Sequence, residues 1–145
     1  TSSDANYAGL IPSSVAVVNV DNDTAGISVS VMSGDTHEDG TQATFAVVLN
    51  SEPLANVVVK FATDDATEGT TAANSITFTA ANWNAVQFVT VTGQNDDVAD
   101  GNQPYQIDFQ ATSSSDPRYA GLISASVNVV NIDDDSPGIG VSEAD

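Results

Sequence analysis

The chain has very few of the residue types on which several common functions depend. Cysteine is absent, which excludes a disulfide framework, a thiolate metal site and a cysteine nucleophile. Apart from His37, Lys60 and Arg118 are the only cationic side chains against 20 acidic ones, so the formal net charge is -18. This charge excludes a nucleic-acid partner, because binding to phosphates requires a positive surface, and it also disfavours anionic membranes.

Long apolar runs are also missing. No stretch approaches the roughly 20 residues that cross a bilayer, so we expect no membrane insertion. Aromatic residues make up only 6% of the chain and form no visible stacking platform. The hydrophobic fraction of 41% nevertheless argues against disorder, and 145 residues are enough for one domain with a core.

The chain does contain an internal repeat. Residues 7–11 return as residues 119–123, and residues 17–23 return as residues 129–135, both at an offset of 112 residues. A constant offset indicates a tandem array. We therefore expect three parts: residues 1–24 are the last strand and tail of a preceding repeat, residues 25–137 form a complete repeat, and residues 138–145 begin a following one.

Within the complete repeat, apolar residues alternate with a period of two. The alternating stretches predict seven strands, at residues 27–31, 43–49, 57–61, 76–78, 86–92, 105–111 and 127–132. Turn-rich polar segments separate them, and none shows a helical stripe. Seven short strands in about 110 residues predict an all-β, immunoglobulin-like β-sandwich with Greek-key antiparallel sheets.

The acidic residues are predicted to gather at one pole of this sandwich, where the first, third, fifth and seventh strands end. The candidate metal ligands in these connections are Glu38, Asp39, Asp64, Asp65, Asp96, Asp97, Asp100, Asp133, Asp134 and Asp135. So many carboxylates cannot all stay ionised at close range without a cation. Oxygen-only ligands favour a hard cation, and a flexible set favours Ca²⁺ over Mg²⁺. The alternative is a solvated acidic pole that keeps the protein soluble.

Asp21 and Asp23, one repeat earlier, are weaker candidates at the preceding junction, because they lack the rest of their ligand set. Residues 15–20 also lack the sheet to which they would belong. An exposed alternating strand pairs readily with any free edge. We therefore expect this strand either to pack loosely or to pair with a neighbouring molecule.

Several short motifs resemble those of a known family. They are the residues 63–65 (Thr-Asp-Asp), 76–78 (Ile-Thr-Phe) and 89–91 (Val-Thr-Val), the loop from Asp96 to Asp100 with Tyr105 after it, and the terminal aspartates 133–135. Together they resemble a Calx-β domain, which occurs in tandem in large bacterial surface and adhesin proteins and in sodium–calcium exchangers.

The resemblance implies that calcium is held by Glu38, Asp65, the acids of the 96–100 loop and the terminal aspartates. This chain departs from the family at Ala66, where glycine is usual, and at Gln103, where a second acid often lies. The family's Asp-Tyr pair is missing around residues 72–74, and Asp100 stands where glutamate is common.

Two functions remain open on these grounds. The first is a calcium-binding structural, or extender, repeat of a secreted or cell-surface protein, in which Ca²⁺ stiffens the domain and its junction with neighbouring repeats of the same chain. The second is an adhesion module that recognises host or matrix carbohydrate or protein. An enzyme is not expected, because no nucleophile–base pair is evident and His37 is predicted to lie in a loop.

Overall fold

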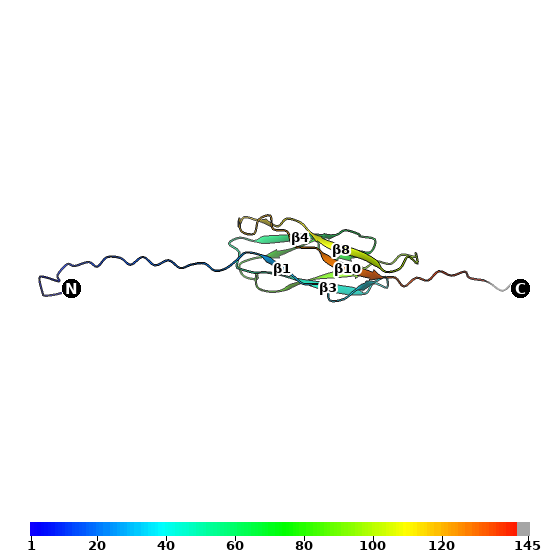
Figure 1. Cartoon of the computed structure of the whole chain (residues 1–145), viewed down its shortest axis with the longest axis horizontal. Coiled ribbons are helices and arrows are strands. Elements are labelled where there is room, and N and C mark those ends of the chain that lie inside the picture. Colours follow the sequence, from blue (N-terminus) through cyan, green and yellow to red (C-terminus); the bar gives the residue numbers. More distant parts are fainter. Residues whose placement is uncertain (142–145) are drawn as a thin grey trace.

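Ten β-strands form the body of the molecule in the computed structural model, which describes residues 1–141 (Figure 1). Their bounds are β1 (Ile27–Val29), β2 (Thr36–His37), β3 (Gln42–Leu49), β4 (Val57–Thr63), β5 (Gly69–Thr71), β6 (Ser75–Phe78), β7 (Gln87–Gly93), β8 (Gln103–Phe109), β9 (Ser113–Ser114) and β10 (Val127–Ile132). The all-β sandwich predicted from the alternating pattern is confirmed. Among the described residues, no helix is long or apolar enough to cross a membrane.

The strands form two sheets. One sheet has the order β1-β3-β7-β5, and the other has the order β2-β10-β8-β4-β6, with β9 also paired to β4. The seven predicted strands correspond to β1, β3, β4, β6, β7, β8 and β10. The three further strands β2, β5 and β9 are only two or three residues long, too short for an alternating pattern to reveal them. His37, which was expected in a loop, lies in β2.

The pairing of β2 departs from the expected antiparallel order. β2 runs parallel to β10, with Thr36 opposite Asn131 and His37 opposite Ile132. The other strand pairs in the described residues are antiparallel. The chain therefore crosses from the edge of one sheet at β1 to the edge of the other at β2, and this crossing decides where Glu38 lies.

The core lies between the two sheets and is built from alternate residues of each strand. On β3, for example, Phe45, Val47 and Leu49 are at most 2% exposed. The ring of Phe45 packs edge-on against those of Phe61 and Phe109, at centroid distances of 5.6 and 5.9 Å. The period of two in the sequence is thus the alternation between core and solvent.

The N-terminal and C-terminal segments leave the sandwich at opposite ends (Figure 1). The N-terminal segment contains a backbone turn that also occurs in the connection between β9 and β10. Asp4 and Asp116 each accept two backbone hydrogen bonds at 3.0 Å from the residues three and four positions later. Gly9 and Gly121 follow with the same positive φ of 78°. The similarity at the 112-residue offset therefore extends from sequence to local conformation.

Candidate metal centre

The parallel pairing of β2 with β10 brings two acidic segments together. Glu38 is the first residue after β2, and its N–H donates to the carbonyl of Ile132, the last residue of β10, at 3.1 Å. The next three residues of the chain are Asp133, Asp134 and Asp135. Segments that are almost 100 residues apart in the sequence therefore become neighbours at one pole of the sandwich.

Three carboxylates converge at this pole. Oxygen atoms of Glu38, Asp133 and Asp135 all lie within 4.8 Å of one another. Glu38 is only 4% exposed, and the Oδ2 atom of Asp135 is buried with no hydrogen-bond partner among the described atoms. Buried polar atoms are normally satisfied, so an orphaned carboxylate oxygen beside two other carboxylates fits a hard cation at this position.

The electrostatics of the pole agree with this arrangement. Burial raises the pKa of Glu38, and the nearby charges of Asp133, Asp96 and Asp135 raise it further. Burial likewise raises the pKa of Asp135, with added repulsion from Asp133 and from the two acids of the β7–β8 loop, Asp97 and Asp96. Without a cation, the ionised forms of these groups therefore repel one another in the folded protein.

Backbone contacts fix the loops around the three carboxylates. The N–H of Gly101 donates to Asp133 Oδ2 at 2.7 Å, and the N–H of Asp133 donates to Asn102 Oδ1 at 3.2 Å. The N–H of Asp135 donates to Asp133 Oδ1 at 2.7 Å. Gly101 adopts a φ of 80°, a left-handed conformation in which glycine has no steric cost. These contacts tie the β7–β8 loop to the end of β10.

Other predicted ligands lie outside the group of three. Asp39 accepts from the N–H and hydroxyl of Thr41 at 2.8 and 2.6 Å, and Asp65 accepts in the same way from Thr67 at 2.9 and 2.6 Å. These bonds lower the pKa of Asp39 and of Asp65. The bond from the threonine hydroxyl has the larger effect, and the bond from the backbone N–H has the next largest. Asp64 accepts from a backbone N–H of β8 at 2.7 Å. Asp39 and Asp65 therefore stabilise their own loops, and Asp64 ties the end of β4 to β8.

Four further candidates are also exposed. Asp134 points to solvent, while its N–H lies 3.4 Å from Glu38 Oε2, and Asp100 is also exposed. Asp21 and Asp23 lie in the exposed N-terminal segment. There the N–H of Asp23 donates to Asp21 Oδ1 at 3.0 Å, the same local contact that joins the two aspartates at 133 and 135.

A buried polar network beneath the carboxylates was not predicted from the sequence. Asn131, 1% exposed, donates to the Gln94 carbonyl at 2.9 Å and to Glu68 Oε2 at 3.3 Å. The Thr36 hydroxyl donates to the side-chain Oδ1 of Asn131 at 3.2 Å and lies 3.0 Å from the Tyr105 hydroxyl. This network holds β2 against β10 and β8, and so sets the positions of the acids that follow β2 and β10.

Two sequence features could have revealed the network. Asn131 lies among the core-facing residues of β10, where Val127 and Val129 are apolar, and the same amide recurs one repeat earlier as Asn19. Gly93 ends β7 where a Cβ atom would lie only 2.5 Å from Asn131 Oδ1 and would also clash with the His37 carbonyl. A core-facing amide next to an obligatory glycine indicates close packing of polar groups.

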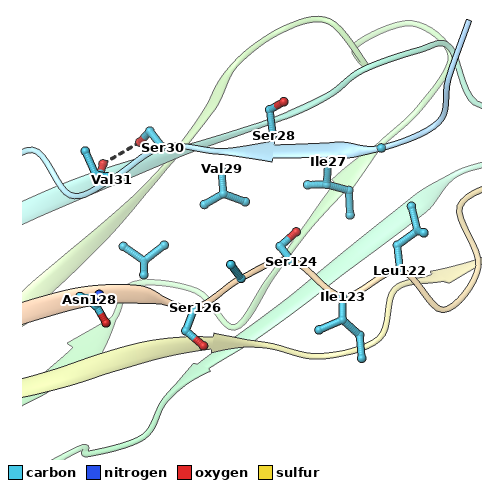
Figure 2. Close-up of a pocket in the computed structure, with 13 residues that line it drawn as sticks. Ile27, Ser28, Val29, Ser30, Val31, Leu122, Ile123, Ser124, Ser126 and Asn128 are labelled. Atoms are coloured by element: carbon cyan, nitrogen blue, oxygen red, sulfur yellow. Dashed lines mark hydrogen bonds between the residues drawn. The ribbon is translucent and has the colours of Figure 1, made fainter.

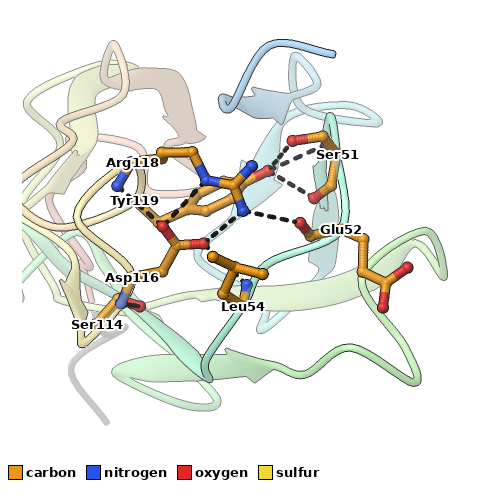
Figure 3. Close-up of polar contacts among 7 residues, drawn as sticks. All are labelled: Ser51, Glu52, Leu54, Ser114, Asp116, Arg118 and Tyr119. Carbon is orange, nitrogen blue, oxygen red and sulfur yellow. Dashed lines mark hydrogen bonds and ion pairs between the residues drawn. The ribbon is translucent and has the colours of Figure 1, made fainter. Parts of the chain in front are cut away.

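The opposite pole holds a second polar cluster, which is structural (Figure 3). Tyr119 is fully buried, and its hydroxyl donates to the Ser51 carbonyl at 2.6 Å and accepts from the Ser51 N–H at 3.1 Å. Asp116 accepts from the Arg118 guanidinium at 2.9 and 3.1 Å and from the Leu54 N–H at 2.8 Å. These bonds hold the pKa of Asp116 well below its usual range. Both carboxylate oxygens of Asp116 already accept hydrogen bonds, so we assign this cluster a structural role.

Comparisons with known proteins support the fold and leave the family open. No family model and no curated protein matches the chain. Similar solved structures include the periplasmic chaperone SfaE, with a TM-score of 0.55 and 9% identity, where the alignment covers 75% of this chain and 58% of that one. The E. coli chaperone DraB gives 0.53 and 6%, covering 79% and 59%. The PapD-like domain 7 of human CEP192 gives 0.53 and 7%, covering 88% and 99%.

These similarities define the class of fold. The shared feature is an immunoglobulin-type β-sandwich, and at identities below 10% the likeness shows the fold alone. The chain spans less than two thirds of the length of the two chaperones. The resemblance to Calx-β domains stays a prediction.

Proposed function

We propose that this chain is a calcium-binding structural repeat of a secreted or cell-surface protein. The observation that carries the proposal is the buried, partnerless Oδ2 of Asp135 beside Glu38 and Asp133. A divalent cation at this point would offset most of the charge of three converging carboxylates and satisfy the orphaned oxygen. The chemistry it supplies there is electrostatic only, and no reaction is implied.

Calcium fits these residues better than magnesium. The candidate ligands are all oxygen atoms, and the charges of Asp96 and Asp97 on the β7–β8 loop act on Asp135, so this loop is where we expect further oxygen ligands to come from. Ca²⁺ accepts six to eight oxygen ligands in flexible geometry, whereas Mg²⁺ demands a tight octahedron. A secreted setting would supply calcium at concentrations that occupy even a weak site, and one protein of similar fold is a periplasmic chaperone.

The position of the three carboxylates at the end of the repeat suggests how calcium would act in a tandem array of repeats. The C-terminal segment leaves the sandwich after β10 (Figure 1). Ser136 alone separates Asp135 from Pro137, which is the counterpart of Ala25. Ala25 packs against the core of its repeat. An ion shared by Glu38, Asp133 and Asp135 would therefore clamp the chain at the point where one repeat passes into the next and stiffen the junction.

Thermal unfolding in EDTA, in CaCl₂ and in MgCl₂ tests the proposal. At free calcium of 100 times Kd, the folded state gains about 2.7 kcal/mol. For a domain of this size that corresponds to a rise in Tm of about 10 °C. We expect this rise with calcium, a smaller one with magnesium, and loss of most of it in the variants E38Q and D135N.

The matched control is Asp35→Asn, which removes one exposed charge just before β2 and outside the group of three. It should leave the calcium shift intact. If calcium does not move Tm, or if D35N weakens the shift as much as E38Q, the acidic pole is only solvated. In that case the adhesion module recognising carbohydrate or protein becomes the better proposal.

A further inference from the structure

The outer face of the β1-β3-β7-β5 sheet is uncharged. None of these four strands, all of which lie within the described residues, contains an acidic or basic side chain, although the chain has 20 acidic residues. The other sheet differs, because Lys60 lies on β4 and Asp108 lies on β8. An uncharged face offers an ionic partner no opposite charge, so we expect a partner of this face to be neutral as well.

Exposed aromatic and hydroxyl side chains lie next to each other on this face. Phe88 on β7 is 70% exposed. Thr90 and Thr92 follow it on the same face, because alternate residues of a strand point to the same side. Their cross-strand partners on β3 are Thr44 and Gln42, and the Gln42 amide donates to the Thr92 hydroxyl at 3.1 Å. The face therefore combines an apolar ring with a patch of neutral hydrogen-bonding groups.

The uncharged surface continues around the edge of the sheet at β1. From this strand, Ser28 points to the outer face, whereas Ile27 and Val29 point towards a groove (Figure 2). The groove has a volume of about 680 Å³ and lies between residues 26–31 and residues 122–128, and none of the described residues that line it is charged. A long ligand that crosses the face therefore finds an uncharged path beyond the edge of the sheet.

A neutral sugar chain has the chemistry that this face complements. Each sugar ring presents apolar C–H groups on its two faces and hydroxyl groups around its edge. The exposed ring of Phe88 offers a surface against which such C–H groups pack. The threonine hydroxyls and the Gln42 amide can each donate and accept hydrogen bonds. An apolar protein segment would cover these groups without satisfying them, which costs free energy.

The size of the face argues against a second copy of the chain as the partner. Four strands about 4.8 Å apart, with up to about six paired residues each at about 3.3 Å, cover no more than about 400 Å². A stable protein–protein interface buries about 800 Å² on each partner, and two copies of net charge -18 also repel each other. A long polymer is not limited in this way, because it can contact the same face on several repeats of an array, and many weak contacts together bind tightly.

We propose that the outer face of the β1-β3-β7-β5 sheet binds a neutral polysaccharide. Phe88 packs against the face of a sugar ring, and the hydroxyl of Thr90, two residues later on β7, bonds to the hydroxyl groups at the edge of the ring. This site is separate from the three carboxylates of the acidic pole and needs no cation. It would give each repeat a binding function in addition to a structural one.

Pull-down with three insoluble neutral polysaccharides, cellulose, chitin and starch, tests the proposal on the full chain in EDTA. The polysaccharide is used in large excess, because a single face binds weakly. We expect at least one of the three to retain the chain. Phe88→Thr keeps a strand-forming residue but should lower the ratio of bound to free protein by about tenfold, because it removes most of the apolar contact. Thr90→Val, which keeps the shape and removes the hydroxyl, should lower it about threefold to tenfold.

Leu54→Ala is the matched control. It removes an apolar side chain that is 82% exposed and lies in the β3–β4 connection, outside the face. Binding should stay unchanged in this variant. Thermal unfolding of all the variants separates a loss of binding from a loss of the fold, and we expect each to unfold within a few degrees of the wild type.

Three results would overturn the proposal. The first is that none of the three polysaccharides retains the chain. The second is an equal loss of binding in F88T and L54A, which would show unspecific adsorption of apolar side chains. The third is a dimer, measured by light scattering, that F88T dissociates, because the face would then be a contact between copies of the chain. Since every sample contains EDTA, a negative result here does not affect the calcium-induced rise in Tm, and the two proposals fail independently.

Discussion

The hydroxyl of Tyr119 should contribute several times more to the free energy of unfolding than an average surface contact does. Tyr119→Phe removes a fully buried oxygen that lies 3.1 Å from the N–H and 2.6 Å from the carbonyl of Ser51. Ser51 is itself only 4% exposed, so water cannot replace the lost partner. Each buried group left unsatisfied costs about 1–3 kcal/mol. We therefore expect a loss of about 2–4 kcal/mol in the free energy of unfolding.

Urea unfolding followed by tryptophan fluorescence measures this loss, since Trp83 packs against the core. With an m-value of about 2 kcal/mol/M, the midpoint should fall by about 1–2 M urea at unchanged slope. The chain supplies a matched control in Tyr7→Phe. This residue occupies the same turn one repeat earlier but is 66% exposed. Equal midpoints for Y119F and wild type, or equal losses for Y119F and Y7F, would refute the reasoning.

Three further predictions follow from the described contacts. Gly121→Ala should cost about 1–2 kcal/mol of stability, because a φ of 78° is unfavourable for alanine. The cost is one of backbone conformation alone, since no atom lies within 4 Å of the added Cβ. The control Gly9→Ala should leave unfolding of the sandwich unchanged. Gly93→Ala should cost about 1–3 kcal/mol of stability by overpacking against Asn131, and it should also reduce the calcium-induced rise in Tm. An unchanged rise would show that the buried network around Asn131 does not position the carboxylates of the calcium site. In EDTA, Tm should increase as pH falls from 7 towards the raised pKa values of Glu38 and Asp135, because the folded state binds more protons than the unfolded state there. Below about pH 4 Tm should decrease, because Asp116 takes up a proton in the unfolded state while its lowered pKa keeps it ionised in the folded state. A Tm that drops steadily from pH 7 would contradict the expected rise.

The sequence predicted the sandwich because its signal is local. Alternation along β3, β4, β7 and β8 is visible in each strand separately, and burial in the structure follows it residue by residue. The 112-residue offset predicted that residues 1–24 copy residues 113–136, and the turns at Asp4 and Asp116 share their hydrogen bonds. Strands of two residues, such as β2, gave no such signal.

The sequence was less informative about the candidate site. It placed ten carboxylates at one pole, but an aspartate in a loop can serve either a cation or its own backbone. Asp65 and Asp39 accept hydrogen bonds from threonines two residues later and hold their own loops, whereas Asp135 keeps a buried oxygen without a partner. Composition and spacing cannot separate these cases, because both use the same residue type in a turn.

By itself, the amino-acid sequence determined the fold class, the repeat and the acidity of one pole, since each depends on periodicity, self-similarity or charge along the chain. Only the tertiary structure decided which acids meet. Glu38 reaches Asp133 and Asp135 because the chain changes sheets after β1 and pairs β2 parallel to β10, held there by the buried contacts of Asn131 and Thr36. That contact spans nearly the whole repeat, and its geometry depends on how two sheets pack, which no local pattern specifies.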